Sequence, residues 1–325
     1  MSAYRLLADI GGTNARFALQ ARGRDCADVE VLACRDYGTI AAAIAAYLAR
    51  AAARGHDTGG LRHAALAIAN PVEGDAVAMT NHDWRFSIEA LRGAFKLETL
   101  LVVNDFAALA LALPHLDDDG RVRIGSPHAA PAPGRPIGLI GPGTGLGVSG
   151  VVPVAPATPG AGTNWIALAG EGGHASFAPA TRQERRLLDA LAEEHGHVSN
   201  ERLLSGPGLE AIHRVLAGEV LGAAAITARA LDGTSAACRD TVDVFCAVLG
   251  SVAGNVALTL GATGGMYVGG GIVPRLGPLF GASPFRARFE DKGRLRPWLA
   301  RIPTWLVTAP YPALRGVAAL LDAAT

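Results

Sequence analysis

The apolar positions in the first third of the chain alternate between two periods. Continuous apolar or β-rich runs predict strands at Leu61–Ala69 and Thr99–Val103. Helical spacing of aliphatic residues predicts a helix at Ile40–Ala53, and further helices are expected at Ser87–Phe95, with the serine as its cap, and at Asp105–Leu113, before a proline. This alternation of strands and helices predicts an α/β fold.

The rest of the chain becomes mostly helical after one more strand. Ser126–Pro136 is rich in Pro and Ala and is expected to be a surface loop, Ile137–Ile140 is a predicted strand, and Val151–Thr163 is expected to be irregular. The elements predicted beyond these are helices at Arg182–Glu194, Gly206–Leu216, Ala223–Leu231, Ser235–Leu260 and Arg315–Ala324, and a strand at Met266–Val268.

One uncharged stretch, Val244–Pro274, is long enough to cross a bilayer. Asn255, Thr259 and several glycines interrupt it, so we expect a buried helix followed by a buried strand and no association with a membrane. No signal peptide is expected either, because the apolar start is short and Asp9 interrupts it.

Length and charge narrow the class of protein further. The 325 residues suffice for one large domain or two ordinary ones. Lys plus Arg and Asp plus Glu both number 29, which leaves no basic footprint for nucleic acid or an anionic membrane. The four cysteines form no Cys-x-x-Cys pair, so we expect free thiols in a reducing cytosol and no tightly bound zinc.

The segment Leu7–Leu19 predicts a strand, a tight turn and a second strand. The turn Gly11–Asn14 begins with two glycines, whose missing side chains let a phosphate approach backbone N–H groups. Asp9, just before the turn, is suited to face a hydrated cation. The alternative is an ordinary hairpin that contains glycine.

A second glycine cluster follows the predicted strand Ile137–Ile140. Four glycines alternate through Gly141–Gly147 and offer several backbone donors to a phosphate. Gly145–Gly150 also matches the dinucleotide pattern Gly-x-Gly-x-x-Gly, but that pattern must open a helix, whereas Val148–Pro153 is typical of a strand. No P-loop motif is present, and a tight glycine hairpin without a ligand is the alternative.

Polar side chains at three further places are candidates for substrate contacts. Asp105 follows a predicted strand and opens a helix, a position from which it could accept a proton from a hydroxyl, although it could also be a simple helix cap. Glu171 and His174 flank two glycines, in a pattern better suited to binding hydroxyls than a metal. Glu201 is unremarkable by itself, and the Asn81–Trp84 segment could line a polar cleft but is more typical of a core.

Together these segments resemble the bacterial glucokinases of the hexokinase/actin-like ATPase superfamily, over Leu7 to about Leu321. The resemblance implies a sugar site and a catalytic base, Asp105. The sugar-binding residues that it implies are Asn104, Asp105, Glu171, His174 and Glu201. The nucleotide-binding residues that it implies are Asp9, Gly11, Gly12, Thr13, Asn14, Gly143, Thr144, Gly145, Gly269 and Gly270.

The resemblance also implies an α/β, two-domain actin-like ATPase (ribonuclease H-like) fold with a cleft between a small and a large domain. We expect residues 1–104 and 309–325 in the small domain and 105–308 in the large one. The Ala175–Pro179 segment lacks the cysteines of the zinc-binding branch of related sugar kinases and repressors, which speaks against that branch.

The function implied is ATP-dependent phosphorylation of the 6-hydroxyl of D-glucose, with Mg²⁺ on the ATP phosphates near Asp9. A cytoplasmic homodimer is expected from the family. The alternatives are a kinase for mannose, fructose or an N-acetyl sugar, and a sugar-sensing repressor on the same fold. The repressor is disfavoured because only a few residues precede Asp9 and the net charge is zero. A chaperone- or filament-like ATPase is disfavoured because it would lack the sugar-binding groups.

Overall fold

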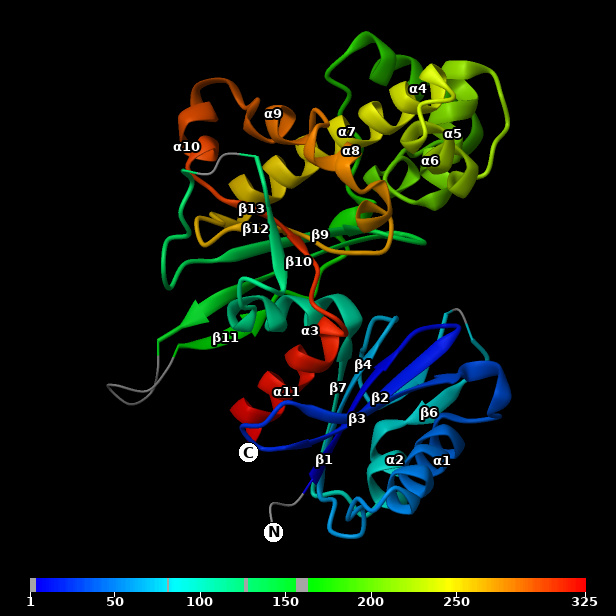
Figure 1. Ribbon diagram of the computed structural model, residues 1–325, viewed down its shortest axis with the longest axis vertical. Coiled ribbons are helices and arrows are strands. Elements are labelled where there is room, and N and C mark those ends of the chain that lie inside the picture. The colour runs from blue at the N-terminus through cyan, green and yellow to red at the C-terminus, as the bar shows by residue number, and fades with distance from the viewer. Residues whose placement is uncertain (1–3, 81, 126–127, 156–162) are drawn as a thin grey trace. The chain divides into compact units, whose positions relative to one another are not determined.

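The computed structural model describes residues 4–80, 82–125, 128–155 and 163–325 (Figure 1). The chain forms two compact units: unit 1 is Met1–Leu116 with Pro310–Thr325, and unit 2 is Asp117–Ala309. The first boundary therefore lies after Leu116, later in the chain than the expected boundary at 104/105. The reason is that helix α3 (Asp105–Ala112) packs against the C-terminal helix α11 (Pro312–Ala324) inside unit 1.

Unit 1 is built on a five-stranded sheet of order β3-β2-β1-β4-β7. The first three strands are antiparallel, whereas β1, β4 and β7 run parallel. The strands are β1 (Tyr4–Ile10), β2 (Asn14–Ala21), β3 (Cys26–Ala33), β4 (His63–Ile68) and β7 (Thr99–Asn104), with a small separate hairpin of β5 (Ala76–Ala78) and β6 (Arg85–Ser87). Helices α1 (Ile40–Ala53) and α2 (Ile88–Ala94) and the 3-10 turns η1 (Cys34–Asp36) and η2 (Leu113–His115) complete the unit with α3 and α11.

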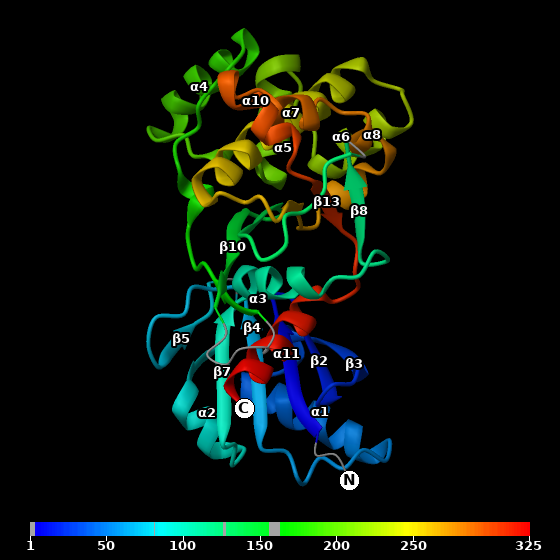
Figure 2. The same ribbon diagram turned by 90° about the vertical axis from the view of Figure 1, so that its left-hand side faces the viewer.

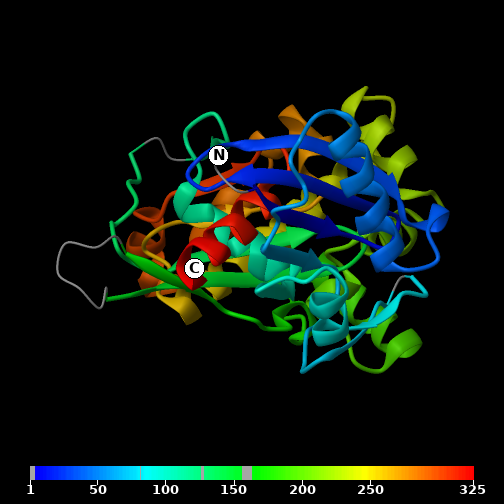
Figure 3. The ribbon, with the colours of Figure 1, turned by 90° about the horizontal axis from the view of Figure 1, so that it is seen from below.

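Helices cover both faces of this sheet. Side chains of α1 and α2 pack with one set of strand residues, and α3 and α11 pack with the alternate set. Figures 1 and 2 show α3 and α11 side by side, and Figure 3 shows α11 across the sheet from α1. The two helices approach so closely that a Cβ atom at Gly316 would lie 1.7 Å from the Ala108 carbonyl oxygen, so only glycine fits there.

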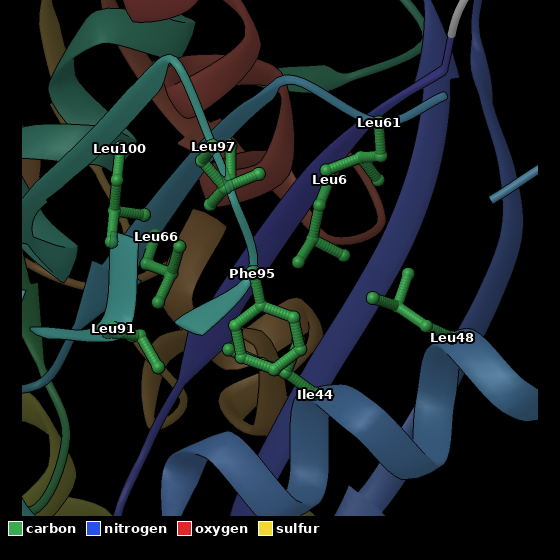
Figure 4. Close-up of a pocket in the computed structure, with 10 residues that line it drawn as sticks. Leu6, Ile44, Leu48, Leu61, Leu66, Leu91, Phe95, Leu97 and Leu100 are labelled. Carbon is green, nitrogen blue, oxygen red and sulfur yellow. The ribbon is translucent and has the colours of Figure 1, made fainter. Parts of the chain in front are cut away.

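The core under α1 and α2 contains a small apolar cavity (Figure 4). Its volume of about 10 Å³ is at the lower limit for one water molecule, and no polar group lines it, so we expect it to be dry. The side chains labelled in Figure 4 come from the sheet, from the residues just before β4, from α1 and from the segment around α2: Leu6, Ile44, Leu48, Leu61, Leu66, Leu91, Phe95, Leu97 and Leu100.

Unit 2 contains a six-stranded sheet of order β11-β10-β9-β12-β13-β8. Its strands are β8 (Arg121–Ile124), β9 (Ile137–Pro142), β10 (Leu146–Val154), β11 (Asn164–Ala167), β12 (Met266–Val268) and β13 (Thr304–Val307). Its helices are α4 (Arg182–His195), α5 (Gly206–Ala217), α6 (Ala223–Leu231), α7 (Ala236–Leu260), α8 (Pro278–Gly281), α9 (Phe285–Glu290) and α10 (Arg296–Ala300). Four 3-10 turns lie between them: η3 (Gly172–His174), η4 (Asn200–Arg202), η5 (Val273–Leu276) and η6 (Gly293–Leu295).

Helix α7 is the centre of the helical layer of unit 2. It packs on β9 and against α5, α6 and α9, and a Cβ atom at Gly250 would lie 2.2 Å from the Phe285 carbonyl oxygen. By length and composition, it is the one helix in the described residues that could cross a membrane, but most of its apolar stretch is buried within the protein. The predicted buried helix followed by the strand β12 is confirmed.

The two sheets share a strand topology. In unit 2, β9, β10 and β11 are antiparallel, as β1, β2 and β3 are in unit 1. Strands β9, β12 and β13 run parallel, as β1, β4 and β7 do. Strand β8 is an addition at the edge, antiparallel to β13. The prediction that Val151–Thr163 is irregular is wrong at its start, because Val151–Val154 pairs with β11; residues 156–162 lie outside the described structure.

Candidate active site

In unit 1, the predicted site residues meet at the carboxyl ends of three parallel strands. Ile10 of β1 is in register with Ile68 of β4, which is in register with Asn104 of β7. The residues that follow these strand ends therefore gather at one edge of the sheet, which is where open α/β sheets bind ligands. The set includes the Gly11–Asn14 turn and Asp105.

The Gly11–Asn14 turn is held by main-chain hydrogen bonds. The Gly11 N–H donates to the Asn14 carbonyl at 2.9 Å, and the Cys34 N–H donates to the Thr13 carbonyl at 2.9 Å. The turn is thus a hairpin, as predicted, and its first two residues, Gly11 and Gly12, have no side chains to cover the main chain. Binding of a phosphate there stays a prediction.

Asp9 lies at the base of this hairpin, directly across from Arg16. Its Oδ2 atom accepts a hydrogen bond from the Arg16 guanidinium at 3.1 Å, and its Oδ1 atom has no hydrogen bond within the described residues. Burial raises the pKa of the Asp9 carboxyl, and the Arg16 charge opposes the rise. A cation near Oδ1 would favour the ionised form, so the residue fits the expected place beside Mg²⁺.

Asn104, rather than Asp105, caps helix α3. Its Oδ1 atom accepts hydrogen bonds from the N–H groups of Phe106 at 2.9 Å and Ala107 at 3.2 Å, and its amide donates to the Asn70 carbonyl at 3.4 Å. The capping function that sequence alone could assign to Asp105 is therefore already carried by its neighbour.

Asp105 has an unusual environment for a carboxylate at a helix start. Its Oδ1 atom accepts a hydrogen bond from the Phe106 N–H at 2.9 Å. Burial, followed by the negative charge of Asp9, raises the pKa of Asp105 to about 6. A carboxylate with such a pKa is mostly ionised at neutral pH and holds a proton more tightly than an ordinary aspartate, which suits a general base.

In the Asn81–Trp84 segment, the tryptophan lies in the core and does not line a polar cleft. Trp84 is fully buried, and its indole N–H donates to the Tyr37 carbonyl at 2.9 Å. The His82 ring meets the Trp84 ring edge-on at 4.7 Å. Trp84 is thus a core residue, and Asn81 lies outside the described residues.

In unit 2, the Gly141–Gly147 cluster forms the turn of the β9–β10 hairpin. The Gly143 N–H donates to the Gly145 carbonyl at 2.8 Å, and the N–H of Gly206, the first residue of α5, donates to the Gly143 carbonyl at 2.9 Å. A strand, β10, follows the turn, as predicted, whereas a dinucleotide-binding pattern would be followed by a helix.

The second glycine turn of unit 2 packs against the first. Because β9 and β12 are parallel and Ile140 is in register with Val268, both turns leave the same edge of the sheet. Gly270 has a φ of +78°, and a Cβ atom on it would lie 2.4 Å from the Pro142 carbonyl oxygen, so glycine is required. The Gly269 N–H donates to the Ile140 carbonyl at 2.8 Å.

The predicted sugar residues of unit 2 gather beside the β9–β10 turn. The Glu201 Oε2 atom accepts a hydrogen bond from the Leu146 N–H at 2.8 Å. Gly173 packs so closely on the same strand residue that a Cβ atom would lie 2.1 Å from the Leu146 carbonyl oxygen, which places Glu171 and His174 next to the turn. Within the described chain, the side chains of Glu171 and His174 and the Oε1 atom of Glu201 have no hydrogen-bond partner in the protein.

Sequence reasoning missed two contacts that position these groups. Nothing local to Asn70 indicated that its carbonyl would hold the Asn104 amide, and nothing local to Glu201 indicated its bond to the glycine turn. Both contacts join segments far apart in the sequence. The described ranges contain no group of three or more His, Cys, Asp or Glu side chains arranged to hold a metal ion.

Comparison with known proteins gives consistent matches along the chain. The family model described as Glucokinase matches residues 6–324. A glucokinase from Chromobacterium violaceum is 53% identical over 323 residues, which are 98% of this chain and 89% of the relative. The crystal structure of a glucokinase from an Antarctic psychrotroph superposes with a TM-score of 0.86 at 36% identity and covers 99% of this chain and 100% of that one.

Other relatives are longer than this chain. The "Bifunctional protein glk" of Paraburkholderia xenovorans is 52% identical over 324 residues, 98% of this chain, but the chain spans only 48% of that relative. The superposed structure confirms the predicted α/β actin-like fold class. The chain belongs to the glucokinase family.

Proposed function

We propose that this protein transfers the γ-phosphoryl group of ATP to the 6-hydroxyl of D-glucose, with Asp105 as the general base. The observation that carries this proposal is that Asp105 is not the cap of α3 and has a raised pKa. Its capping function is taken by Asn104, and burial beside Asp9 raises its pKa to about 6. A structural cap would need neither feature.

The reaction follows from the position of this carboxylate. Asp105 accepts the proton of the sugar hydroxyl while the hydroxyl oxygen forms a bond to the γ-phosphorus and the bond to the β,γ-bridging oxygen of ATP breaks. Phosphoryl transfer of this kind has a loose transition state, so positioning and charge stabilisation supply most of the rate.

Glucose recognition is assigned to the residues named from the sequence. Asn104 and Asp105 of unit 1, and Glu171, His174 and Glu201 of unit 2, offer a mixture of hydrogen-bond donors and acceptors that suits sugar hydroxyls. Support comes from the carboxylate oxygen of Glu201 that remains unpaired after its bond to Leu146, and from the exposed side chains of Glu171 and His174.

Nucleotide binding is assigned to the three glycine turns. In the Gly11–Asn14 and Gly143–Gly145 turns the glycines leave main-chain groups uncovered, and Thr13, Asn14 and Thr144 add polar side chains, which suits phosphates. Gly269–Gly270 is assigned to the adenosine. Mg²⁺ would arrive with ATP and neutralise phosphate charge near Asp9, whose Oδ1 atom is unpaired in the described residues. The chain's own contribution there is to hold that carboxylate in place through Arg16.

The proposal also includes a cytoplasmic, magnesium-dependent enzyme of glycolysis that forms a homodimer and binds neither nucleic acid nor membrane. The balanced charge supports the absence of nucleic-acid binding. The homodimer is an expectation from the family and is tested by sedimentation of the purified protein.

The decisive experiment is an ATP-dependent assay over a panel of glucose, mannose, fructose and N-acetylglucosamine. We expect the largest kcat/KM with glucose and formation of glucose 6-phosphate, identified by its oxidation with glucose-6-phosphate dehydrogenase. A larger kcat/KM with another sugar would reassign the substrate, and no phosphorylation of any hexose would refute the proposed function.

A further inference from the structure

Behind the segment that carries Glu171 and His174, unit 2 contains an open cavity of about 340 Å³ that the proposed reaction does not use. It lies between β10, the 168–176 segment and the C-terminal half of α7. Its walls include Val148, Val252, Val256 and Leu260. The volume is within the usual range for small-molecule sites.

The chemistry of the walls specifies the kind of molecule that fits. No Asp, Glu, Lys, Arg or His is among the described residues that line the cavity, so a charged ligand would lose hydration without gaining a partner. The lining is mainly apolar, with a few hydroxyl and amide groups. Two of the hydroxyls are already occupied, since Ser149 donates to the Leu168 carbonyl and Thr259 to the Asn255 carbonyl.

Asn200 supplies a polar group with no partner in the described residues to the otherwise mainly apolar wall. It lines the cavity and is only 6% exposed, yet its side-chain amide makes no hydrogen bond within the described residues. Its amide atoms keep contact with the open cavity, where water or a bound molecule can pair with them. Asn200 therefore offers a donor and an acceptor to a molecule in the cavity.

The cavity is connected to the proposed sugar residues by direct packing. Gly172 lines it, and a Cβ atom on Gly172 would lie 2.9 Å from the Val148 side chain, so that segment cannot move independently of the cavity wall. The Asn200 N–H donates to the Ala175 carbonyl at 2.9 Å, and Glu201 is the next residue along the chain. A molecule between Val148 and Asn200 would therefore press on both segments that carry sugar-binding groups.

We propose that this cavity binds a small, uncharged, mainly apolar molecule with one hydrogen-bonding group held by Asn200, and that its occupancy changes the affinity for glucose. Binding itself does not depend on the proposed function, whereas its effect on glucose rests on that function. The probe is benzamide, which combines a ring with a neutral amide, and benzoate is its charged counterpart of similar shape.

Titrations by ligand-observed NMR would use the full chain and three variants. We expect saturable benzamide binding, much weaker benzoate binding, and loss of benzamide binding in Val256→Trp, whose indole obstructs the cavity from the α7 wall. Asn200→Leu should weaken benzamide by about fivefold, the effect of one neutral hydrogen bond. Val220→Trp makes the same change at a position that is 82% exposed and should bind benzamide like the parent protein.

Glucose calorimetry with and without saturating benzamide tests the coupling. We expect a change in the glucose Kd of about fivefold or more in the parent protein, a typical allosteric effect, and none in Val256→Trp. Absence of benzamide binding, or equal binding to Val256→Trp, would overturn the site, and an unchanged glucose Kd would overturn the coupling. If glucose fails to bind at all while benzamide binds, the proposed function fails and the site stands. A lower oligomeric state of Val256→Trp in sedimentation would show instead that a second copy covers this face, which also overturns the proposal.

Discussion

Replacement of Asp105 by asparagine should separate catalysis from folding. Asparagine keeps the size of the side chain and can still bond a sugar hydroxyl, but its amide cannot take up the hydroxyl proton. If Asp105 is the general base, kcat should fall by at least about 100-fold, the low end for general base catalysis, and the glucose Kd should change much less.

The same change should make the protein more stable at neutral pH. Burial and the charge of Asp9 raise the pKa of Asp105 from 3.8 to about 6. A difference of about two pKa units corresponds to about 3 kcal/mol of cost for the ionised carboxylate, and partial solvent screening reduces this to about 1–3 kcal/mol. Asparagine removes the cost, so we expect Tm to rise by a few degrees.

The sign of the pH dependence follows from the raised pKa. Between the unfolded value of 3.8 and the folded value of about 6, the native state binds more protons, so this carboxyl favours folding at low pH and that contribution is lost as the pH rises through about 6. The stability difference between Asp105→Asn and the parent protein should therefore be full above pH 6 and vanish below pH 3.8. The kcat/KM of the parent protein should decline as the pH falls below about 6.

The measurements are coupled-assay kinetics and thermal melts over this pH range. Asp36→Asn is the matched control, because it neutralises a carboxylate that is 63% exposed in the same unit and should alter neither kcat nor Tm. If Asp105 were only part of a helix cap, asparagine would serve equally well. A folded Asp105→Asn variant that retains more than about a tenth of the parent kcat would refute the catalytic assignment, and a lower Tm at neutral pH would refute the electrostatic reasoning.

Four further predictions test the other parts of the protein. Gly143→Val should raise the KM for ATP strongly and leave the glucose Kd nearly unchanged. A Cβ atom there meets only the Gly145 carbonyl oxygen, at 4.0 Å, so the turn can accommodate it, but the added methyl groups obstruct phosphate approach. Unchanged ATP kinetics would contradict this. Glu171→Ala should weaken glucose binding by at least about tenfold in calorimetry, while ATP binding persists, and equal glucose affinity would reject the assignment. Elemental analysis should find no stoichiometric zinc, and activity should require added Mg²⁺ alone. Leu66→Ala should lower the free energy of unfolding by about 3–5 kcal/mol in urea melts, since the new void joins the existing cavity and little can collapse to fill it, whereas a loss below about 1 kcal/mol would show that the core closes.

The elements with local signals were predictable from the sequence. Helix α1 was predicted at Ile40–Ala53 and is found there, with the Thr39 side chain accepting the Ala42 N–H. Ser87 caps α2 as expected, by accepting the Ala90 N–H. In these cases periodicity and capping chemistry act within a few residues, so no tertiary information was needed.

Three of the four strands at the edges of the two large sheets lacked such signals, whereas the fourth, β7, was predicted from its β-rich sequence. β3 (Cys26–Ala33) is half-exposed along most of its length, and β8 and β11 also lie at edges, where both polar and apolar side chains are tolerated. The strand conformation of these segments depends on pairing with a neighbouring strand. For β8 that neighbour, β13, is distant in the sequence. No period in the hydrophobic pattern marks that pairing.

The site shows the same division between local and distant information. The glycine turns were recognisable because a chain that must turn without side chains uses glycine, and Gly270, with its positive φ against Pro142, is the clearest case. The raised pKa of Asp105 was not recognisable from the sequence. This raised pKa depends on burial and on Asp9, which is on strand β1, and only the fold brings the two carboxyls together.

Glu201 illustrates how one distant contact changes the interpretation of a residue. By itself it is an ordinary glutamate in a polar segment, and the resemblance implied only that it binds sugar. In the structure its Oε2 atom holds the Leu146 N–H, and a Cβ atom on Gly145 would lie 2.4 Å from that oxygen. The glycine is therefore needed to let the carboxylate reach the turn, in addition to any phosphate contact. One oxygen of Glu201 fixes the geometry of the predicted phosphate turn and the other is left for the sugar, so this residue joins the two halves of the proposed substrate site within unit 2.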